Sequence, residues 1–180
     1  MAVTGIKHIA FAVSDVDAAL QQFQTVLGMG EDATVRQSAV TNQRSCSFMV
    51  GDVQYQLVQG LDPAGRYARH VAEHGESINH ICYIVDDLRA TVAQAQAEGA
   101  KLREQTCRLS DDPAEIARWK ATVGPDSVCK NCGIVGQYEH PEGWVCFLEQ
   151  SDVPGTGVEL MQVYKTEEIP AQYRKGPLDL

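Results

Sequence analysis

The sequence predicts an α+β protein built from two copies of one module, in which a strand is followed by a helix and then by three further strands. Two internal matches indicate this duplication. Residues 6–16 (IKHIAFAVSDV) resemble residues 78–88 (INHICYIVDDL), which lie 72 positions later. Residues 54–59 (QYQLVQ) match residues 157–162 (GVELMQ), which lie 103 positions later. We therefore expect the two halves to fold alike.

Each copy opens with a strand whose side chains alternate between two faces. In the first copy the apolar Ile9, Phe11 and Val13 share one face, whereas His8 points to the other. His80 occupies the equivalent position of the second copy. The repeat therefore predicts two histidines on matching faces of matching strands.

A helix follows each of these strands. In the first copy Ser14 is the expected N-cap, with Asp17 completing a capping-box pattern, and Gly28 ends the apolar stripe. In the second copy Asp86 or Asp87 is the expected cap, and a glycine again ends the helix.

The remaining strands are predicted from β-propensity and turn signals. The ranges are 33–40, 45–50 and 53–58 in the first half, and 101–107, 143–148 and 157–163 in the second. Because the spacing of the second match exceeds that of the first by 31 residues, the second half must contain an insertion of about that length.

These elements predict four segments. A first module spans residues 1–62, a linking helix 63–75, and a second module 76–164 with an insertion at about 106–144. An extended arm follows at 165–180, where two prolines disfavour a helix. With 180 residues, the chain is long enough for one domain or two small halves.

Composition and charge exclude several partners. The chain is 44% hydrophobic and 22% charged, and its net charge of −9 is the wrong sign for nucleic acid or an anionic membrane. No apolar run is long enough to span a bilayer, and the N-terminal residues lack a signal-peptide pattern, so a cytoplasmic location is expected. Six cysteines are too few for a disulfide scaffold and are expected to be thiols or metal ligands.

Four polar residues stand at duplicated positions: His8, Gln56, His80 and Glu159. Two imidazoles and two side-chain oxygens suit a divalent transition metal with open positions for a substrate. A single buried histidine is more often a hydrogen-bonded core residue, but packing alone accounts poorly for four such groups in equivalent places. We therefore predict that these residues form one metal site within one chain.

These residues and the flanking strands resemble the vicinal oxygen chelate superfamily, which comprises glyoxalases, bleomycin-resistance proteins and dioxygenases. The resemblance extends over about residues 5–162 and is nearest to the methylmalonyl-CoA epimerase group. It implies paired βαβββ modules that form a half-open curved sheet or barrel around a metal, and it implies that two copies of the chain form a homodimer. The epimerase ligand set carries over to His8, Gln56, His80 and Glu159.

The resemblance also implies an activity. A bound Co, Mn, Zn or Ni ion stabilises an enolate, so that a carbon beside a carbonyl loses its proton. Glu159 is the implied base, and the implied reaction is epimerisation or isomerisation of a small molecule, possibly an acyl-CoA.

Two features depart from the epimerase pattern. A second glutamate is expected on a strand of the first module, but residues 41–46 (TNQRSC) contain no carboxylate, so Glu149 and His140 become the candidate second acid or base. The insertion carries a helix pattern that starts at Asp111 and ends at Gly124, and a folded segment there would cover the cavity and change substrate choice.

The insertion also contains the pair Cys129 and Cys132 in a CxxC motif. It is half of a structural zinc site, and completion would need Cys107, His140 or Cys146. A redox role and ordinary reduced thiols are the alternatives.

Other functions share this scaffold. A glyoxalase-like lyase uses the same metal chemistry, and His8, His80 and Glu159 also match the ligand pattern of an Fe(II) ring-cleaving dioxygenase. A non-enzymatic drug-binding protein is the third alternative, although the retained ligand set argues against it.

Overall fold

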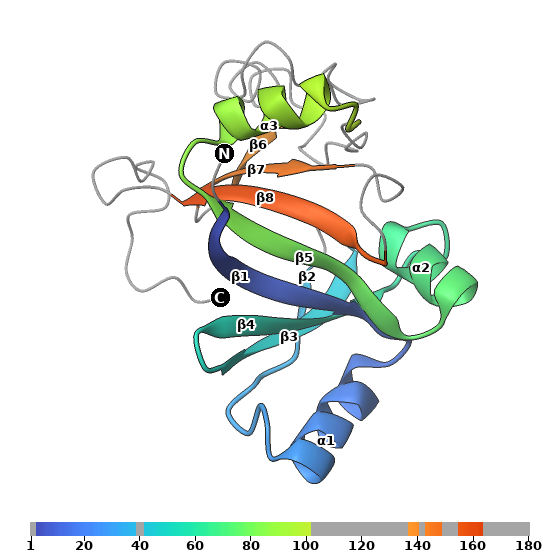
Figure 1. Cartoon of the computed structure of the whole chain (residues 1–180). Coiled ribbons are helices and arrows are strands. Elements are labelled where there is room, and N and C mark those ends of the chain that lie inside the picture. The colour runs from blue at the N-terminus through green and yellow to red at the C-terminus, as the bar shows by residue number, and fades with distance from the viewer. Residues whose placement is uncertain (1–2, 39–41, 102–136, 141–142, 149–154, 164–180) are drawn as a thin grey trace, which may run out of the picture. The chain divides into compact units, whose positions relative to one another are not determined.

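The computed structural model describes residues 3–38, 42–101, 137–140, 143–148 and 155–163 of the chain. Its elements, in chain order (Figure 1), are β1 (Val3–Ala12), α1 (Val16–Leu27), β2 (Arg36–Ser38), β3 (Gln43–Val50), β4 (Val53–Gly60), α2 (Arg66–His74), β5 (Ser77–Val85), α3 (Leu88–Ala97), β6 (Gln137–His140), β7 (Gly143–Phe147) and β8 (Gly157–Val163). Each half has the order of strand, helix and three strands. The predicted α+β fold of paired βαβββ modules is confirmed.

The chain divides into two compact units: Ile6–Cys82, called the first unit, and Met1–Gly5 with Tyr83–Leu180, called the second unit. In the first unit the strands are hydrogen-bonded in the order β2-β3-β4-β1-β5. β3 and β4 form an antiparallel hairpin, whereas β1 and β4 are parallel. Parallel strands need a crossover connection, and α1 lies in the segment that provides it.

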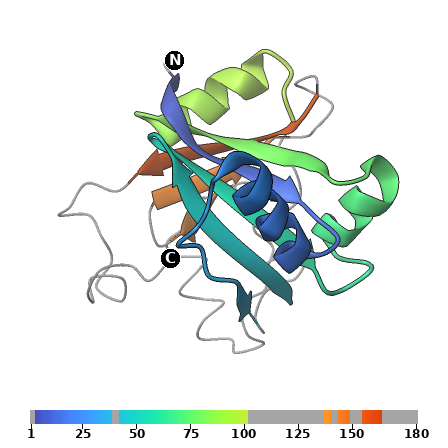
Figure 2. The same cartoon turned by 90° about the horizontal axis from the view of Figure 1, so that it is seen from below.

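The core of the first unit lies between α1 and one face of the strands. Figure 2 shows α1 lying across β3 and β4. Four aromatic rings meet in this layer, with centroids 5.4 to 6.3 Å apart for the pairs that involve Tyr55. The buried residues of this core are Val13, Val16, Ala19, Leu20, Cys46, Phe48 and Leu57. Because these side chains occupy one face, the alternating polar residues of the same strands, including His8, lie on the other.

The start of α1 differs from the expectation. Asp15 is the N-cap, and its Oδ1 accepts hydrogen bonds from the backbone N–H groups of Asp17 at 3.0 Å and Ala18 at 3.2 Å. The predicted Ser14 cap is therefore wrong. The Ser14 hydroxyl instead donates to the Glu76 carboxylate, so it is not available to cap the helix. A carboxylate in the cap position is favoured because it also interacts with the positive end of the helix dipole.

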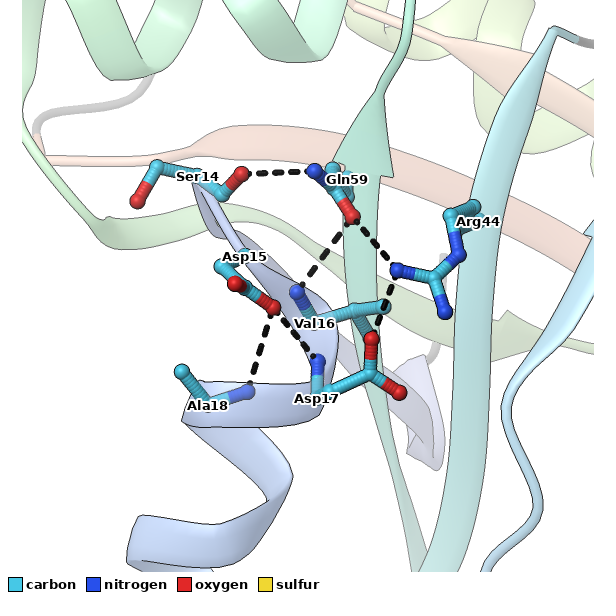
Figure 3. A network of polar contacts seen from close by, with 7 residues as sticks. All are labelled: Ser14, Asp15, Val16, Asp17, Ala18, Arg44 and Gln59. Carbon is cyan, nitrogen blue, oxygen red and sulfur yellow. Dashed lines mark hydrogen bonds and ion pairs between the residues drawn. The ribbon is translucent and has the colours of Figure 1, made fainter.

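A polar network joins the start of α1 to the two neighbouring strands (Figure 3). Arg44 on β3 forms an ion pair with Asp17, with 2.6 Å between Nη1 and Oδ2. Gln59 at the end of β4 donates from Nε2 to the carbonyl oxygen of Ser14 at 2.7 Å. Its Oε1 lies 3.5 Å from both the Val16 backbone nitrogen and Arg44 Nη1. The network holds the β1–α1 connection against the end of β4.

The linking helix is shorter than the sequence suggested. Residues 61–65 form bends and a turn, and α2 begins only after Gly65. The Asp62 side chain accepts from the Ala64 N–H at 2.9 Å and its carbonyl from the Gly65 N–H at 2.8 Å, so the local hydrogen bonds form a turn in place of a first helical turn. At Gly60 an added Cβ would lie 2.8 Å from the Ala68 backbone nitrogen, so the close packing of α2 on β4 requires glycine there.

In the second unit, β7 pairs antiparallel with both β8 and β6. Asp87, one of the two predicted caps, accepts the Ala90 N–H at 2.9 Å and begins α3. The α3 side chains pack on β7 and β8. The buried residues of this core are Val85, Leu88, Val92, Cys146, Leu148, Val158 and Leu160. Each unit therefore has its own hydrophobic core.

β6 lies inside the range expected to be an insertion. It pairs with β7 from Gln137 opposite Cys146 to His140 opposite Gly143, and takes the place of the first of the three strands after the helix. The predicted strand from 101, the helix between Asp111 and Gly124, the CxxC motif, Glu149 and the arm at 165–180 fall wholly or almost wholly outside the described residues.

Within the described ranges, the structure contains no helix that is both long and apolar enough to cross a bilayer.

Candidate metal centre

Two buried histidines meet in the first unit. His8 on β1 is 5% exposed and His80 on β5 is 2% exposed. Their Nε2 atoms lie 3.0 Å apart, and the rings are nearly perpendicular, with an interplanar angle of 79°. The structure thus brings together the two histidines that the repeat placed at equivalent positions.

The distance between these nitrogens fits two ligands of one metal ion. Imidazole nitrogens bind a divalent transition metal at about 2.0–2.1 Å, so two ligands at a right angle are about 3.0 Å apart. Without an ion, the 3.0 Å contact is a hydrogen bond in which the Nε2–H of one ring donates to the Nε2 of the other. A metal would use the same two ring nitrogens, once the ring whose Nε2 carries the proton holds it on Nδ1 instead.

Two residues behind His80 orient its ring. His80 Nδ1 lies 3.1 Å from Asn79 Oδ1 and 2.8 Å from Arg66 Nη2, and Arg66 also donates to Asn79 Oδ1. Arginine can only donate, so the amide oxygen of Asn79 is held facing this group. The contact with Arg66 requires Nδ1 to accept, which puts the proton of a neutral ring on Nε2. In the other tautomer Nδ1–H donates to the Asn79 oxygen and Nε2 keeps a lone pair for a metal, the arrangement typical of metal-bound histidines.

The sequence did not point to Arg66 or Asn79. Arg66 is the first residue of α2, and its side chain contacts His80 on β5. Asn79 precedes His80, and is 4% exposed. A polar residue next to a candidate ligand was the available signal for Asn79. Nothing in the local pattern of α2 signals the role of Arg66.

Gln56 lies on β4, but it does not stand directly across from His8. The parallel register places Gln54 opposite His8 and Gln56 opposite Ala10. The Gln56 side chain donates from Nε2 to Gln54 Oε1 at 3.0 Å. Strand alternation puts Gln54, Gln56 and His8 on one face, so Gln54 belongs to the same polar surface although only Gln56 was singled out from the sequence.

Glu159 lies on β8 in the second unit. Its Cα is paired with that of Phe147 on β7, and the residue is 3% exposed. A buried carboxylate is costly unless cations or hydrogen-bond donors surround it, which is the setting of a metal ligand or of a functional acid.

Cys82 is a further buried group on β5. It follows His80 by two residues and is fully buried, and its sulfur lies within 4.8 Å of a ring nitrogen of His8. The first unit therefore offers a thiol beside the two imidazoles.

The strand face next to Gln56 carries hydroxyl groups. Ser47 on β3 is paired with Gln56, and Ser45 with Val58. Residues 42–50 contain no carboxylate, so β3 cannot supply the second acidic group that the epimerase resemblance implies.

The duplicated βαβββ order and a buried histidine on the first strand of each module define a vicinal oxygen chelate fold. The chain belongs to the Glyoxalase/Bleomycin resistance protein/Dioxygenase superfamily, whose family model matches residues 7–117.

Solved structures of methylmalonyl-CoA epimerases share the fold. The enzyme from Mycobacterium tuberculosis is 22% identical, with a TM-score of 0.60 over 92% of this chain and 91% of that one. A Streptomyces coelicolor epimerase variant in complex with 2-nitronate-propionyl-CoA is 19% identical, with a TM-score of 0.59 over 91% and 100%. A methylmalonyl-CoA epimerase in complex with methylmalonyl-CoA and NH4+ is 20% identical, with a TM-score of 0.59 over 94% and 100%.

Proposed function

We propose that this protein is a divalent-metal-dependent epimerase or isomerase that removes a proton from a carbon beside a carbonyl group. The observation that carries the proposal is the buried pair of Nε2 atoms of His8 and His80, 3.0 Å apart. In the proposed site Gln56 and Glu159 supply oxygen donors. When bound, the ion would act as a Lewis acid on the substrate oxygens.

An acyl-CoA is the proposed substrate class. The similar solved structures are methylmalonyl-CoA epimerases, and two of them were determined with methylmalonyl-CoA or 2-nitronate-propionyl-CoA bound. The carbon between a thioester and a carboxylate is a weak acid whose two neighbouring oxygens suit chelation. The family contains several chemistries on one fold, so the substrate rests on this analogy and on the donor set.

Glu159 is the proposed base. Its burial holds the carboxylate in a low-dielectric setting, where proton transfer to and from carbon is effective. Because β3 carries serines in place of a second carboxylate, the proton is returned to the other face by a group outside that hairpin, for which Glu149 and His140 are the candidates. Return by Glu159 itself would give isomerisation or exchange without inversion.

The test combines metal analysis with solvent deuterium exchange. Protein purified without chelator is expected to hold one divalent ion per chain, and His8→Ala to lose it. Methylmalonyl-CoA in D2O is expected to gain deuterium at the carbon beside the carbonyl. Glu159→Gln should slow this exchange by about 10²- to 10⁴-fold, whereas Glu73→Gln, an exposed carboxylate on α2, should not.

Three results would contradict the proposal. Iron with oxygen consumption and no exchange would indicate a dioxygenase. A metal-dependent reaction of a hemithioacetal without exchange into an acyl-CoA would indicate a glyoxalase-like lyase. Protein that binds no divalent ion, in wild type as in His8→Ala, would indicate a binding protein on this fold.

A further inference from the structure

The thiol of Cys82 lies next to the two histidines of the proposed metal site. His80 and Cys82 are two residues apart on β5, so their side chains leave the strand on the same face. Cys82 is fully buried, and its sulfur lies within 4.8 Å of a ring nitrogen of His8, the residue whose Nε2 contacts His80. Three donor side chains from two strands thus gather at one place in the first unit.

We infer that Cys82 is a metal ligand together with His8 and His80, an inference that rests on the proposed metal-dependent function. Sulfur binds zinc at about 2.3 Å and imidazole nitrogen at about 2.1 Å, so a sulfur and a nitrogen on one ion are about 3.1 Å apart at a right angle and about 4.4 Å apart when opposite. In the structure the Cys82 sulfur and the His8 ring nitrogen are at most 4.8 Å apart. A small side-chain rotation would bring them into the range expected for two ligands of one ion.

In this inference the Cys82 thiolate takes the ligand position that the proposed function assigned to Gln56. Gln56 is paired with Ala10, and its amide is engaged with Gln54, whereas Cys82 is near His8. A thiolate is also a stronger ligand for a soft or borderline divalent ion than a neutral amide oxygen. With His8, His80 and Cys82 as ligands, the ion would keep open positions for the two oxygens of a chelating substrate.

Thiolate ligation has a consequence for the choice of metal. The ligand is the deprotonated sulfur, so the sulfur–metal bond forms as the thiol proton is released to solvent. A nitrogen and sulfur donor set favours zinc, cobalt or ferrous iron over manganese or magnesium. The inference therefore selects among the metals that the proposed function left open.

The test is titration of the metal-stripped full-length protein with cobalt(II), followed by near-ultraviolet and visible absorption. Cobalt bound to a thiolate has an intense sulfur-to-cobalt charge-transfer band, which nitrogen and oxygen ligands do not produce. The titration is run in a background with Cys129→Ser and Cys132→Ser, because the CxxC motif is another possible thiolate site.

Cobalt is expected to bind with one charge-transfer band per chain. Cys82→Ser and Cys82→Ala should lose the band and weaken cobalt binding more than about 10-fold, since even groups that only orient a ligand are worth that much. Cys46→Ser, a buried thiol in the core of the first unit, is the matched control and should keep the band. Gln56→Ala should also keep it. Urea unfolding of each variant reports whether it is folded.

The outcomes separate this inference from the proposed function. Cobalt that binds without the band, or a band that survives in both folded Cys82 variants, would overturn the role of Cys82 and leave the metal site standing. Wild-type protein that binds no cobalt, zinc or manganese would overturn the metal-dependent function as well.

Discussion

Gln59 and Gln162 perform the same task in the two units. The side-chain oxygen of Gln162 accepts the backbone N–H of Leu88, the first residue of α3, at 2.8 Å. The side-chain oxygen of Gln59 lies 3.5 Å from the corresponding N–H of Val16, the first residue of α1. In both units the end of the last strand thereby holds the start of the helix. The N-terminal N–H groups of a helix have no partner within the helix, so this contact satisfies one of them.

Replacing these glutamines tests the shared role. Gln162→Ala is expected to lower the free energy of unfolding by about 1 kcal/mol, the usual net value of one such hydrogen bond. Gln59→Ala is expected to cost more, because Gln59 also donates to Ser14 at 2.7 Å and contacts Arg44. Urea denaturation measures both changes. Equal costs would show that the additional contacts of Gln59 contribute nothing.

The caps provide a second prediction. Asp15→Ala and Asp87→Ala are each expected to destabilise the protein by about 0.5–2 kcal/mol, because each removes an N-cap side chain. Ser14→Ala, at the position that the sequence favoured, removes the hydrogen bond to Glu76 and no cap. If Asp15→Ala left thermal and urea unfolding unchanged, the assignment of Asp15 as the cap would be wrong.

Asn79 is expected to control metal affinity through His80. Asn79→Ala removes the oxygen that receives Nδ1–H, and should weaken zinc or cobalt binding about 10- to 100-fold. Asn79→Asp keeps an oxygen acceptor next to Arg66 and should restore most of the affinity. Competition with a chromophoric chelator measures the zinc or cobalt affinity of each variant. Equal loss in both variants would point to a disturbed core, since the residue is buried.

His70 predicts a loss of stability in acid. Burial lowers the pKa of this imidazole below its usual value, and the positive charges of His74 and Arg66 act in the same direction. The neutral ring contacts Ser77 Oγ at 2.9 Å. Below about pH 6.5 the unfolded chain takes up a proton that the folded state resists. The stabilising contribution of neutral His70 is therefore fully present above about pH 6.5. It is lost as the pH falls towards and through the lower pKa that His70 has in the folded protein.

The matched variant for this effect is His70→Gln, which retains a hydrogen-bonding side chain without the titration. Its urea midpoint should change less than that of the wild type between pH 7.5 and pH 5.5. An identical pH dependence in the two proteins would assign the acid sensitivity to other groups.

Cys46 is expected to resist alkylation in the native state. Burial raises the pKa of this thiol to about 11, and the nearby Asp17 carboxylate adds to the rise. At pH 8 only about one molecule in a thousand then carries the thiolate, which is the reactive form. Mass spectrometry after iodoacetamide treatment should find Cys46 modified only after denaturation. Rapid labelling of the folded protein would contradict the position of Cys46 in the core.

The sequence repeat determined more than the order of elements. The spacing of 72 residues relates His8 to His80 and Asp15 to Asp87, and the spacing of 103 relates Gln59 to Gln162. The structure gives equivalent roles to the two aspartates and to the two glutamines, because a duplicated backbone places equivalent residues in equivalent surroundings. The error at Ser14 arose between two adjacent residues that are both favoured caps. The Glu76 carboxylate, distant in sequence, decides between them.

Strand ends in the second half were harder to predict. β6 lies in a segment that the difference between the two repeat spacings marked as an insertion. A strand of four residues is stabilised by pairing with β7 more than by its own propensity, so its sequence carries little signal. The α2 helix began later than its periodicity suggested because the Asp62 turn takes up the residues before it.

The sequence by itself determined the family, the two modules and the histidines, because these are carried by periodic patterns and by a repeat that can be read along the chain. The tertiary structure alone decided that His8 and His80 touch through Nε2, that Gln54 stands opposite His8, and that Arg66 and Asn79 hold the His80 ring. Those contacts depend on the register between strands and on where α2 packs. Such relationships are set by the summed packing of distant segments and leave no local signal in the sequence.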